Sequence, residues 1–441
     1  MYPAQPLRDL PPGATLARAR VPACLVEAEG VALAPERDDD GLVLLDLALA
    51  DGRIASVAPH LAAAPAGPDT VDLAGRIVWP CPVDMHTHLD KGHIWPRARN
   101  PDGTFTGALG TVDADRRAHW SAADVAARME FSLRCAYAHG TRAVRTHLDS
   151  LPPQPAITWP VFAEARERWA GRIELQGVAL AMAEHYRGPV GTELARLVAE
   201  YGGILGLVTE PGPNLDADLD RFLGLASDRG LDVDCHVDET LDPAADGLRR
   251  LARSVIRNRF AGRAVAGHCC SLSVQAPDEV RRTLDLVAEA GVAIVSLPMC
   301  NMYLQDREPG RTPRRRGATI AHEIRARGVP LAYASDNTRD PFYAYGDLDM
   351  HEVLRGAVRI AQLDHPFGDW PAAFSTTPAA VMRLEHAGRV APGAPADLVV
   401  FEGRSWTELL ARPESRRTVL RAGRPVDTTT PAYAELDHLF A

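Results

Sequence analysis

The chain has 441 residues, a formal net charge of -10 at pH 7 and 46% hydrophobic residues. The negative charge argues against general affinity for nucleic acids or acidic membranes, and no segment approaches the roughly 20 apolar residues that span a bilayer. The seven cysteines are an odd number with no Cys-X-X-Cys spacing, so we expect reduced thiols in a cytoplasmic protein without a disulfide framework.

Short strands are predicted near both ends of the chain. Residues 43–49, 53–57 and 396–401 are apolar runs between turns rich in Gly, Pro and Asp. Chain ends commonly lie close together at a domain surface. We therefore expect residues 1–75 and 386–441 to form one small β-sandwich domain.

The intervening region alternates between two kinds of segment. Apolar runs of strand length are separated by stretches with helical periodicity, and this alternation predicts a (β/α)8 barrel of the TIM type over residues 76–385. The predicted strands are residues 76–88, 143–149, 173–180, 203–209, 232–238, 264–270, 293–299 and 330–336. The predicted helices include residues 122–139, 160–170, 215–229, 247–261, 277–291 and 316–328. A long connection over residues 91–121 should cover the rim of the barrel.

Ionisable residues stand at the ends of several predicted strands. His86 and His88 close the first strand, and side chains two positions apart in a strand point to the same side, which suits one metal ion. An isolated His-X-His is also compatible with two ordinary polar residues. However, His236, His268 and Asp336 stand at the ends of three later strands, and in a parallel barrel these ends meet at one rim.

The order of these residues resembles the amidohydrolase superfamily and, within it, the cytosine deaminase branch. Further matching segments are residues 140–147, 236–239, 301–307, 315–317 and 340–343. The resemblance implies one divalent ion, Zn or Fe, held by His86, His88, His236 and Asp336. Some relatives hold two metals through a carboxylated lysine on the fourth strand. Because Lys91 is the only lysine of this chain, we predict one ion per chain.

The same resemblance implies catalytic roles. A metal ion lowers the pKa of its water, which then attacks an electron-poor ring carbon. Glu239 would carry protons to the ring nitrogen and the leaving amine, His268 would hold the nucleophile, and Asp336 would accept a proton from the water. The predicted function is hydrolytic deamination of a small nitrogen heterocycle, cytosine or a related aminopyrimidine, with release of ammonia.

Two positions depart from the cytosine deaminases. Asn337 stands where they usually have aspartate, and Met182 aligns with a glutamine. The segment from His88 to Lys91 and the Asp336-Asn337 pair are similar to enzymes that remove alkylamines from s-triazines such as N-isopropylammelide.

We predict substrate contacts at four positions. Lys91 would reach a ring carbonyl and Phe342 would stack on the ring, while Met182 and Asn337 would face the ring edge. An exposed loop lysine and a packing phenylalanine are the alternatives for Lys91 and Phe342.

Three other functions remain open at this point. They are amine release from N-substituted aminotriazines, ring opening of a cyclic amide, and a catalytically inactive binding protein on the same barrel. In each case we expect a small heterocyclic ligand, no nucleic-acid or membrane partner, and assembly into a homo-oligomer.

Overall fold

The structure is a computed structural model that describes residues 7, 10–27, 37–61, 67–413 and 416–440. It divides into two compact units. The terminal unit comprises Met1–Val83, Ala136–Ala143 and Asp349–Thr430, and the barrel unit comprises Asp84–Cys135, Val144–Leu348 and Pro431–Ala441. Each unit is described separately below.

The barrel is an eight-stranded parallel sheet whose strands pair in sequence order from first to last. A parallel bridge between Thr87 and Asp336 joins the two ends of the sheet and closes the ring. Its strands are β6 (Val83–Thr87), β7 (Ala143–Asp149), β8 (Glu174–Met182), β9 (Ile204–Val208), β10 (Val233–Val237), β11 (Ala264–His268), β12 (Ala293–Ser296) and β13 (Leu331–Tyr333). This arrangement confirms the predicted TIM-type barrel.

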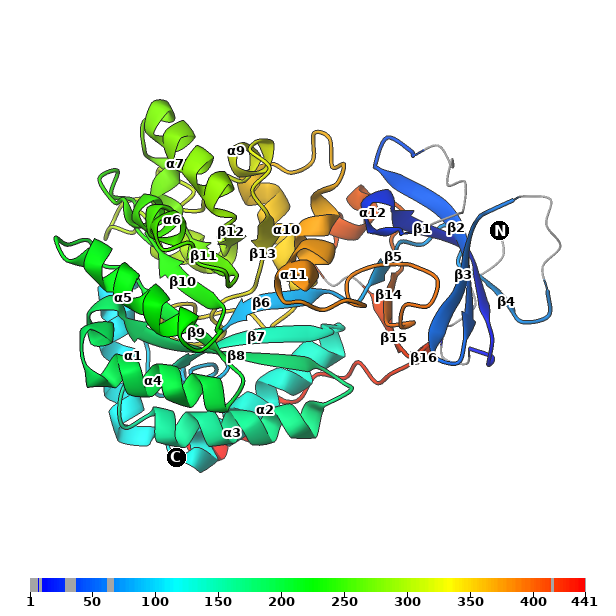
Figure 1. Ribbon diagram of the computed structural model, residues 1–441. Coiled ribbons are helices and arrows are strands. Elements are labelled where there is room, and N and C mark those ends of the chain that lie inside the picture. The colour runs from blue at the N-terminus through cyan, green and yellow to red at the C-terminus, as the bar shows by residue number, and fades with distance from the viewer. Residues whose placement is uncertain (1–6, 8–9, 28–36, 62–66, 414–415, 441) are drawn as a thin grey trace. The chain divides into compact units, whose positions relative to one another are not determined.

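Helices alternate with these strands along the chain and surround them (Figure 1). Strands covered on both faces are continuously apolar, as in the sequence Ile-Leu-Gly-Leu-Val of β9. The helices are α1 (Phe105–His119), α2 (Ala122–His139), α3 (Pro155–Trp169), α4 (Pro189–Glu200), α5 (Leu215–Ser227), α6 (Gly247–Arg257), α7 (Pro277–Ala290), α8 (Pro298–Leu304) and α9 (Ala321–Ala326). The short 3-10 helices η2 (Ala183–Arg187), η3 (Cys270–Ser273) and η5 (Tyr433–Leu439) complete the set.

Helix α7 illustrates why these segments begin and end where they do. Pro277 occupies its first turn, where a missing N–H is harmless, and Asp278 and Glu279 complement the positive end of the helix dipole. Gly291 ends the helix in the left-handed conformation at φ 65°.

The terminal unit contains two four-stranded sheets. One has the order β3-β2-β1-β4 and the other β16-β15-β14-β5. The strands are β1 (Thr15–Pro22), β2 (Leu42–Ala50), β3 (Arg53–Pro59), β4 (Thr70–Asp72), β5 (Val78–Pro80), β14 (Leu398–Phe401), β15 (Arg417–Arg421) and β16 (Arg424–Pro425). Both sheets contribute to one hydrophobic cluster, to which Leu45, Leu47, Leu398 and Leu420 belong.

The terminal unit also contains helical segments. They are α10 (Met350–Ala361), α11 (Thr376–Val381), α12 (Trp406–Ala411), η1 (Ala23–Leu25) and η4 (Trp370–Phe374). None of the helices in the described residues combines the length and the hydrophobicity that crossing a membrane requires.

Several predicted segments differ from the structure. The helix predicted over residues 316–328 is confined to α9, and the strand predicted over residues 330–336 is confined to β13. The single strand expected over residues 76–88 is two strands: β5 pairs with β14 of the terminal unit, and β6 begins the barrel. Pro80 and Pro82 lack the N–H groups that a continuous strand would use. The strand expected over residues 293–299 ends at Ser296, because Pro298 starts α8. The long connection over residues 91–121 contains helix α1.

Candidate metal centre and active site

The four predicted metal ligands lie together at the carboxyl ends of the barrel strands. His86 lies in β6 and His236 in β10, whereas His88 directly follows β6 and Asp336 lies three positions after the end of β13. Nε2 of His236 is 3.2 Å from Nε2 of both His86 and His88. Oδ1 of Asp336 is 3.3 Å from Nε2 of His88 and 3.7 Å from Nε2 of His86.

The three histidine nitrogens lie within 4.8 Å of one another, as ligands of one cation would, and Asp336 adds a carboxylate oxygen beside two of them. Three imidazole nitrogens and a carboxylate oxygen are donors that Zn(II) and Fe(II) both accept. The site therefore fits the predicted divalent metal.

Burial keeps the three histidines in the form that binds metal. Removal from water, followed by the repulsion of neighbouring cationic groups, lowers the pKa of His86, His88 and His236 well below the usual value. The imidazoles are therefore neutral, and a neutral imidazole has a free lone pair for a cation.

Residues with left-handed backbone conformation gather at this end of the barrel. Asp238, His268, Cys269 and Asp336 have φ values of 48°, 70°, 50° and 67°. Such conformations cost about 1–3 kcal/mol each outside glycine, and they persist where the surroundings enforce them, commonly at active sites. At Asp336 the enforcing contact is visible, because its backbone N–H donates to the carbonyl of His86 at 2.9 Å.

Glu239 and His268 lie side by side next to the metal ligands. Oε1 of Glu239 is 3.4 Å from Nδ1 of His268, and both groups are buried. Burial, and secondly the negative charge of Asp336, raises the pKa of Glu239 well above the usual value. A carboxyl group with a raised pKa is suited to receive and return a proton near neutral pH.

Two residues that received no individual role from the sequence support this pair. The amide of Asn301 donates to Oε1 of Glu239 at 3.2 Å and is 2.9 Å from Nδ1 of His268. The amide of Gln305 donates to the backbone carbonyl of Glu239 at 3.1 Å. Asn301 lies on α8, and Gln305 directly follows that helix. Their segment carries part of the family resemblance, but that resemblance did not specify these partners.

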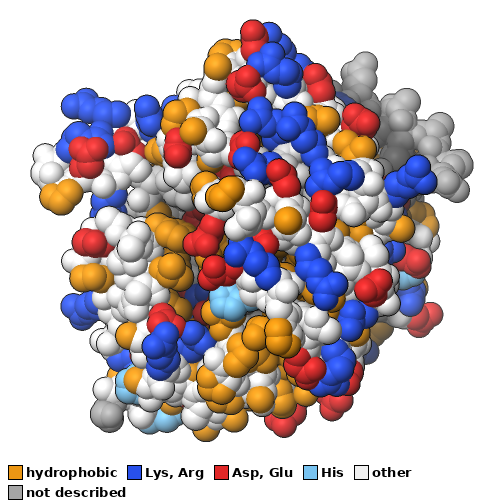
Figure 2. Space-filling model, turned by 60° about the vertical axis from the view of Figure 1, so that its left-hand side comes forward, with side chains coloured by type: hydrophobic (Ala, Val, Ile, Leu, Met, Phe, Trp, Pro, Cys, Tyr) orange, Lys and Arg blue, Asp and Glu red, His pale blue; other side chains and the backbone are white. Residues whose placement is uncertain are grey.

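A cavity of about 910 Å³ opens over this site. Figure 2 shows the face on which the barrel opens, where acidic and hydrophobic side chains surround a hollow. The cavity lining includes His88, His236, Glu239, His268 and all four predicted substrate contacts, Lys91, Met182, Asn337 and Phe342. Helix α1 contributes Phe105, Leu109 and Asp113 to the wall.

Lys91 is a buried residue of this wall and not an exposed loop lysine. Its Nζ lies 2.8 Å from Oδ1 of Asp149 and 5.4 Å from the centre of the Phe342 ring. Phe342 also contacts Phe105 edge to face, with 5.5 Å between ring centres. Asp149 was not expected from the sequence, because it lies on a different strand and belongs to no metal-ligand pattern.

Asn337 is fixed by a neighbour that sequence reasoning also left without a role. Its amide donates to Oδ2 of Asp340 at 2.7 Å, and Oδ1 of Asp340 accepts backbone N–H groups from Phe342 and Tyr343. Asp340 therefore organises the loop that carries both Asn337 and Phe342.

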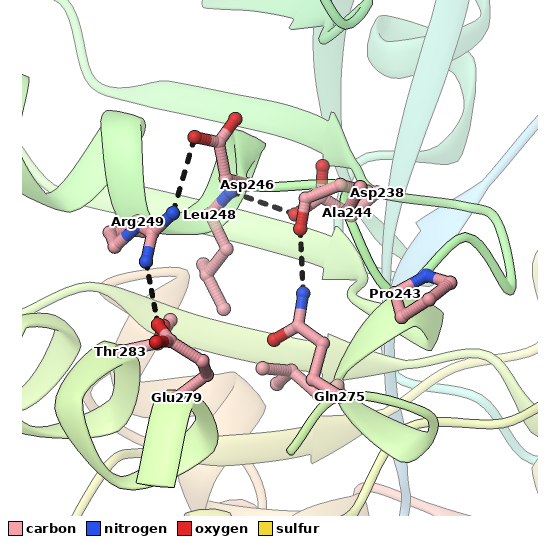
Figure 3. Close-up of a pocket in the computed structure, with 11 residues that line it drawn as sticks. Asp238, Pro243, Ala244, Asp246, Leu248, Arg249, Gln275, Glu279 and Thr283 are labelled. Atoms are coloured by element: carbon pink, nitrogen blue, oxygen red, sulfur yellow. Dashed lines mark hydrogen bonds and ion pairs between the residues drawn. The ribbon is translucent and has the colours of Figure 1, made fainter.

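A second cavity of about 190 Å³ lies between α6, α7 and the loop after β10 (Figure 3). Asp238 separates it from the active site and accepts the N–H groups of Gly247 and Leu248, both at 3.0 Å. On the far side, Arg249 bridges Asp246 and Glu279 (Figure 3). Asp238 thereby caps α6 and fixes the chain immediately before Glu239.

Comparison with known proteins places the chain among the amidohydrolases. The profile of the family described as "Amidohydrolase family" matches residues 160–427. The chain is 52% identical to a pterin deaminase of Rhizobium rhizogenes over 399 residues, which cover 90% of this chain and 91% of the relative. It is 24% identical to an N-isopropylammelide isopropyl amidohydrolase of a Pseudomonas species over 370 residues, 81% of this chain and 87% of the relative.

Solved structures share the fold. A 5-methylcytosine deaminase from Klebsiella pneumoniae, liganded with 5-fluorocytosine, superposes with a TM-score of 0.79 at 24% identity, covering 93% of this chain and 97% of that one. An N-isopropylammelide isopropylaminohydrolase from Burkholderia multivorans superposes with a TM-score of 0.71 at 22% identity, covering 94% and 98%.

Proposed function

The chain belongs to the amidohydrolase family, and we propose that it deaminates a fused bicyclic heterocycle whose pyrimidine ring carries a 2-amino and a 4-oxo group, as pterin does. Metal-dependent hydrolytic deamination of a heterocycle is the chemistry that the family supports. The observation that supports a bicyclic substrate is the 52% identity over 90% of the chain with a pterin deaminase.

The size of the cavity supports a bicyclic substrate. At about 910 Å³ it lies near the upper end of the roughly 300–1,000 Å³ range of small-molecule sites. Met182 also replaces the amide that would read the edge of cytosine, and an unmade hydrogen bond in a buried site costs about 1–3 kcal/mol. The cavity volume favours a larger ring than cytosine, and Met182 argues against recognition of the cytosine edge.

The proposed reaction exchanges one substituent on the ring. The oxygen of water forms a bond to C2, and a proton moves to the adjacent ring nitrogen. The amino nitrogen then gains a proton, and its bond to C2 breaks. The products are the 2,4-dioxo ring and ammonia. Both protons come from the attacking water, so the reaction needs no oxidant or reductant.

The proton transfers fall to Glu239 in this proposal. Its carboxyl group takes a proton from the water, delivers it to the ring nitrogen and then protonates the departing amine. His268 accepts a hydrogen bond from Asn301 at Nδ1, so the proton of its neutral ring is on Nε2 and is available to the attacking oxygen. Asp336 supplies negative charge beside Glu239 and His268.

The remaining residues bind and orient the ring. The ammonium of Lys91 is placed to donate to the 4-oxo group, and the face of Phe342 offers a stacking surface. A divalent ion, Zn or Fe(II), held by His86, His88, His236 and Asp336 would supply the acidity that makes water a nucleophile near neutral pH.

The experiment is a substrate comparison on one protein preparation. Metal-loaded protein is incubated with pterin, cytosine, isocytosine and N-isopropylammelide, and ammonia, free amine and ring products are quantified. The proposal expects ammonia and the intact 2,4-dioxo ring from pterin, with a higher kcat/KM than for any single-ring substrate.

Each of the following outcomes would overturn the proposal of a bicyclic substrate. A higher kcat/KM for cytosine or isocytosine assigns a single-ring substrate, and isopropylamine release assigns the aminotriazine activity. A new carboxylate from any substrate indicates ring opening. Binding of pterin without turnover identifies a binding protein.

A further inference from the structure

His147 is a buried histidine that the proposed reaction does not use, and it lies against three metal ligands. It belongs to β7, and its side chain is fully buried. The centre of its ring is 4.0 Å from that of His86, 4.7 Å from that of His236 and 5.5 Å from that of His88. The ring planes of His147 and His86 are inclined by only 35°.

The three histidine ligands share one feature at their second ring nitrogen. Metal-binding histidines normally donate this N–H to a carboxylate, a carbonyl or a water molecule, which fixes the ring orientation. Nδ1 of His86, His88 and His236 has no hydrogen-bond partner among the residues that the structure describes. Among those residues, ring packing is therefore the contact that can orient these imidazoles.

The His86 ring is confined by two neighbours. One is the ring of His147. The other is Gly267, where an added Cβ would lie 2.9 Å from Cε1 of His86. Only glycine leaves this space, so the backbone of β11 comes directly against the His86 ring.

His147 lies beside a buried charged layer inside the barrel. Its Nε2 is 3.7 Å from Oδ1 of Asp234, which is longer than a hydrogen bond, and Oδ2 of Asp234 accepts a hydrogen bond from Arg145 at 2.8 Å. Nε and Nη2 of Arg145 donate to Oε1 of Gln176 at 3.1 and 2.9 Å. Arg145 precedes His147, and Asp234 precedes His236, by two positions, so each pair shares an inward face of its strand.

We propose that His147 is a positioning residue of the metal centre, whose ring face fixes the orientation of the His86 imidazole. The ring edge of His147 meets the carboxylate, and its face meets the ligand. A second cation between His147 and Asp234 is disfavoured, because Arg145 already neutralises that carboxylate. The inference rests on the proposed metal centre and is independent of the proposed substrate.

The test compares two apolar replacements that differ in shape. His147→Phe keeps a flat ring, whereas His147→Leu removes it, and both lose the ring nitrogens. The metal Kd is measured by competition with a chromophoric chelator, using Zn²⁺ and Co²⁺ alone. The visible absorption of the Co²⁺-loaded protein reports the ligand geometry. His351→Leu removes a buried histidine of the terminal unit and serves as the matched control.

The expected result separates ring contact from general stability. His147→Leu should raise the metal Kd about 10- to 100-fold and change the Co²⁺ spectrum. His147→Phe should stay within about threefold of the wild type, because the flat contact remains, although its apo form should unfold at a lower temperature since Asp234 then faces an apolar edge. His351→Leu should leave the metal Kd unchanged.

Two results would overturn the proposal. One is a wild-type metal Kd in His147→Leu, and the other is a loss in His147→Phe as large as that in His147→Leu. If His147→Leu does not fold, His147→Gln takes its place with the same criteria. Since only metals are used as probes, a protein that meets these expectations but does not deaminate pterin would disprove the proposed function alone.

Discussion

The ammonium of Lys91 lies 2.8 Å from a carboxylate oxygen of Asp149 in the wall of the active-site cavity. Burial by itself lowers the pKa of Lys91, but the charges of Asp149 and Asp90 outweigh it and raise the pKa above its usual value. Asp149 is positioned in turn, because its backbone N–H donates to Asp90 at 2.7 Å. The only lysine of the chain is thus a permanently charged donor facing the substrate space.

Replacing this lysine should reduce substrate binding. Lys91→Met removes a charged donor, and a hydrogen bond to a charged group contributes about 1.5–3 kcal/mol, so kcat/KM should fall about 10- to 150-fold. Steady-state kinetics with pterin, the proposed substrate, measure this effect. Asp149→Asn added to Lys91→Met should cost little more than Lys91→Met alone, because the two side chains act as a pair. Additive losses would show that they act separately.

Glu239→Gln should abolish turnover without releasing metal. The amide has nearly the same shape but cannot carry a proton, so kcat should fall by about 10²–10⁴. Metal content measured by atomic emission should match that of the wild type. Glu193→Gln, on the exposed surface of α4, is the matched control and should retain full activity. Near-normal kcat in Glu239→Gln would remove its assigned role.

Metal analysis should find one divalent ion per chain. The strand that carries the bridging lysine in two-metal relatives is β9, and it contains no lysine here. Lys91 is engaged with Asp149 and is not available as a substitute. Dialysis against a chelator should remove activity, and one equivalent of Zn²⁺ or Fe²⁺ should restore it. Two tightly bound ions per chain would contradict this prediction.

Asp238→Ala should lower both stability and kcat. It removes the cap of α6, which is expected to cost about 0.5–2 kcal/mol, and it frees the backbone immediately before Glu239. Thermal unfolding and kcat are the two measurements. Asp238→Gly tolerates the left-handed backbone at φ 48° but also lacks the cap, so it should recover stability only in part. A full recovery would assign the effect to the backbone alone.

Acid should weaken the terminal unit through Asp349. Burial alone would raise the pKa of Asp349, but Arg417, at 2.6 and 2.8 Å, and His139 lower it well below the ordinary value of 3.8. A depressed folded-state pKa gives stability that is present above about pH 3.8 and is lost as the pH falls towards the folded value.

The Asp349→Asn variant tests this linkage. It should lose about 3–5 kcal/mol near pH 7, because Arg417 keeps a mostly buried charge without its partner. The free energy of unfolding of the variant should then change less between pH 4 and 2 than that of the wild type. The difference should correspond to the loss of one titrating group. Urea unfolding at several pH values measures both. Asp369→Asn breaks an exposed pair with Arg37 and should cost less than about 1 kcal/mol.

The sequence predicted the barrel because its strands are apolar runs with ionisable residues at one end, a pattern that local composition reveals. It did not predict that residues 76–88 belong to two sheets, because β5 and β6 are separated by only two residues and the pairing of β5 with β14 is what places them in different sheets. The clustering of the four candidate metal ligands was predictable because they follow a spacing shared by the family. Asn301, Asp149 and His147 were assigned no individual roles, since their contacts join distant segments without any periodic signal.

The closure of the barrel through Thr87 and Asp336 also sets the order of assembly. His86 lies in the first barrel strand, and Asp336 follows the last one, 250 positions later in the polypeptide. A ribosome must therefore synthesise just over three quarters of the chain before the fourth donor exists. Metal binding is consequently a late event in biosynthesis. A bound ion would cross-link the first and last strands of the barrel, where the sheet closes.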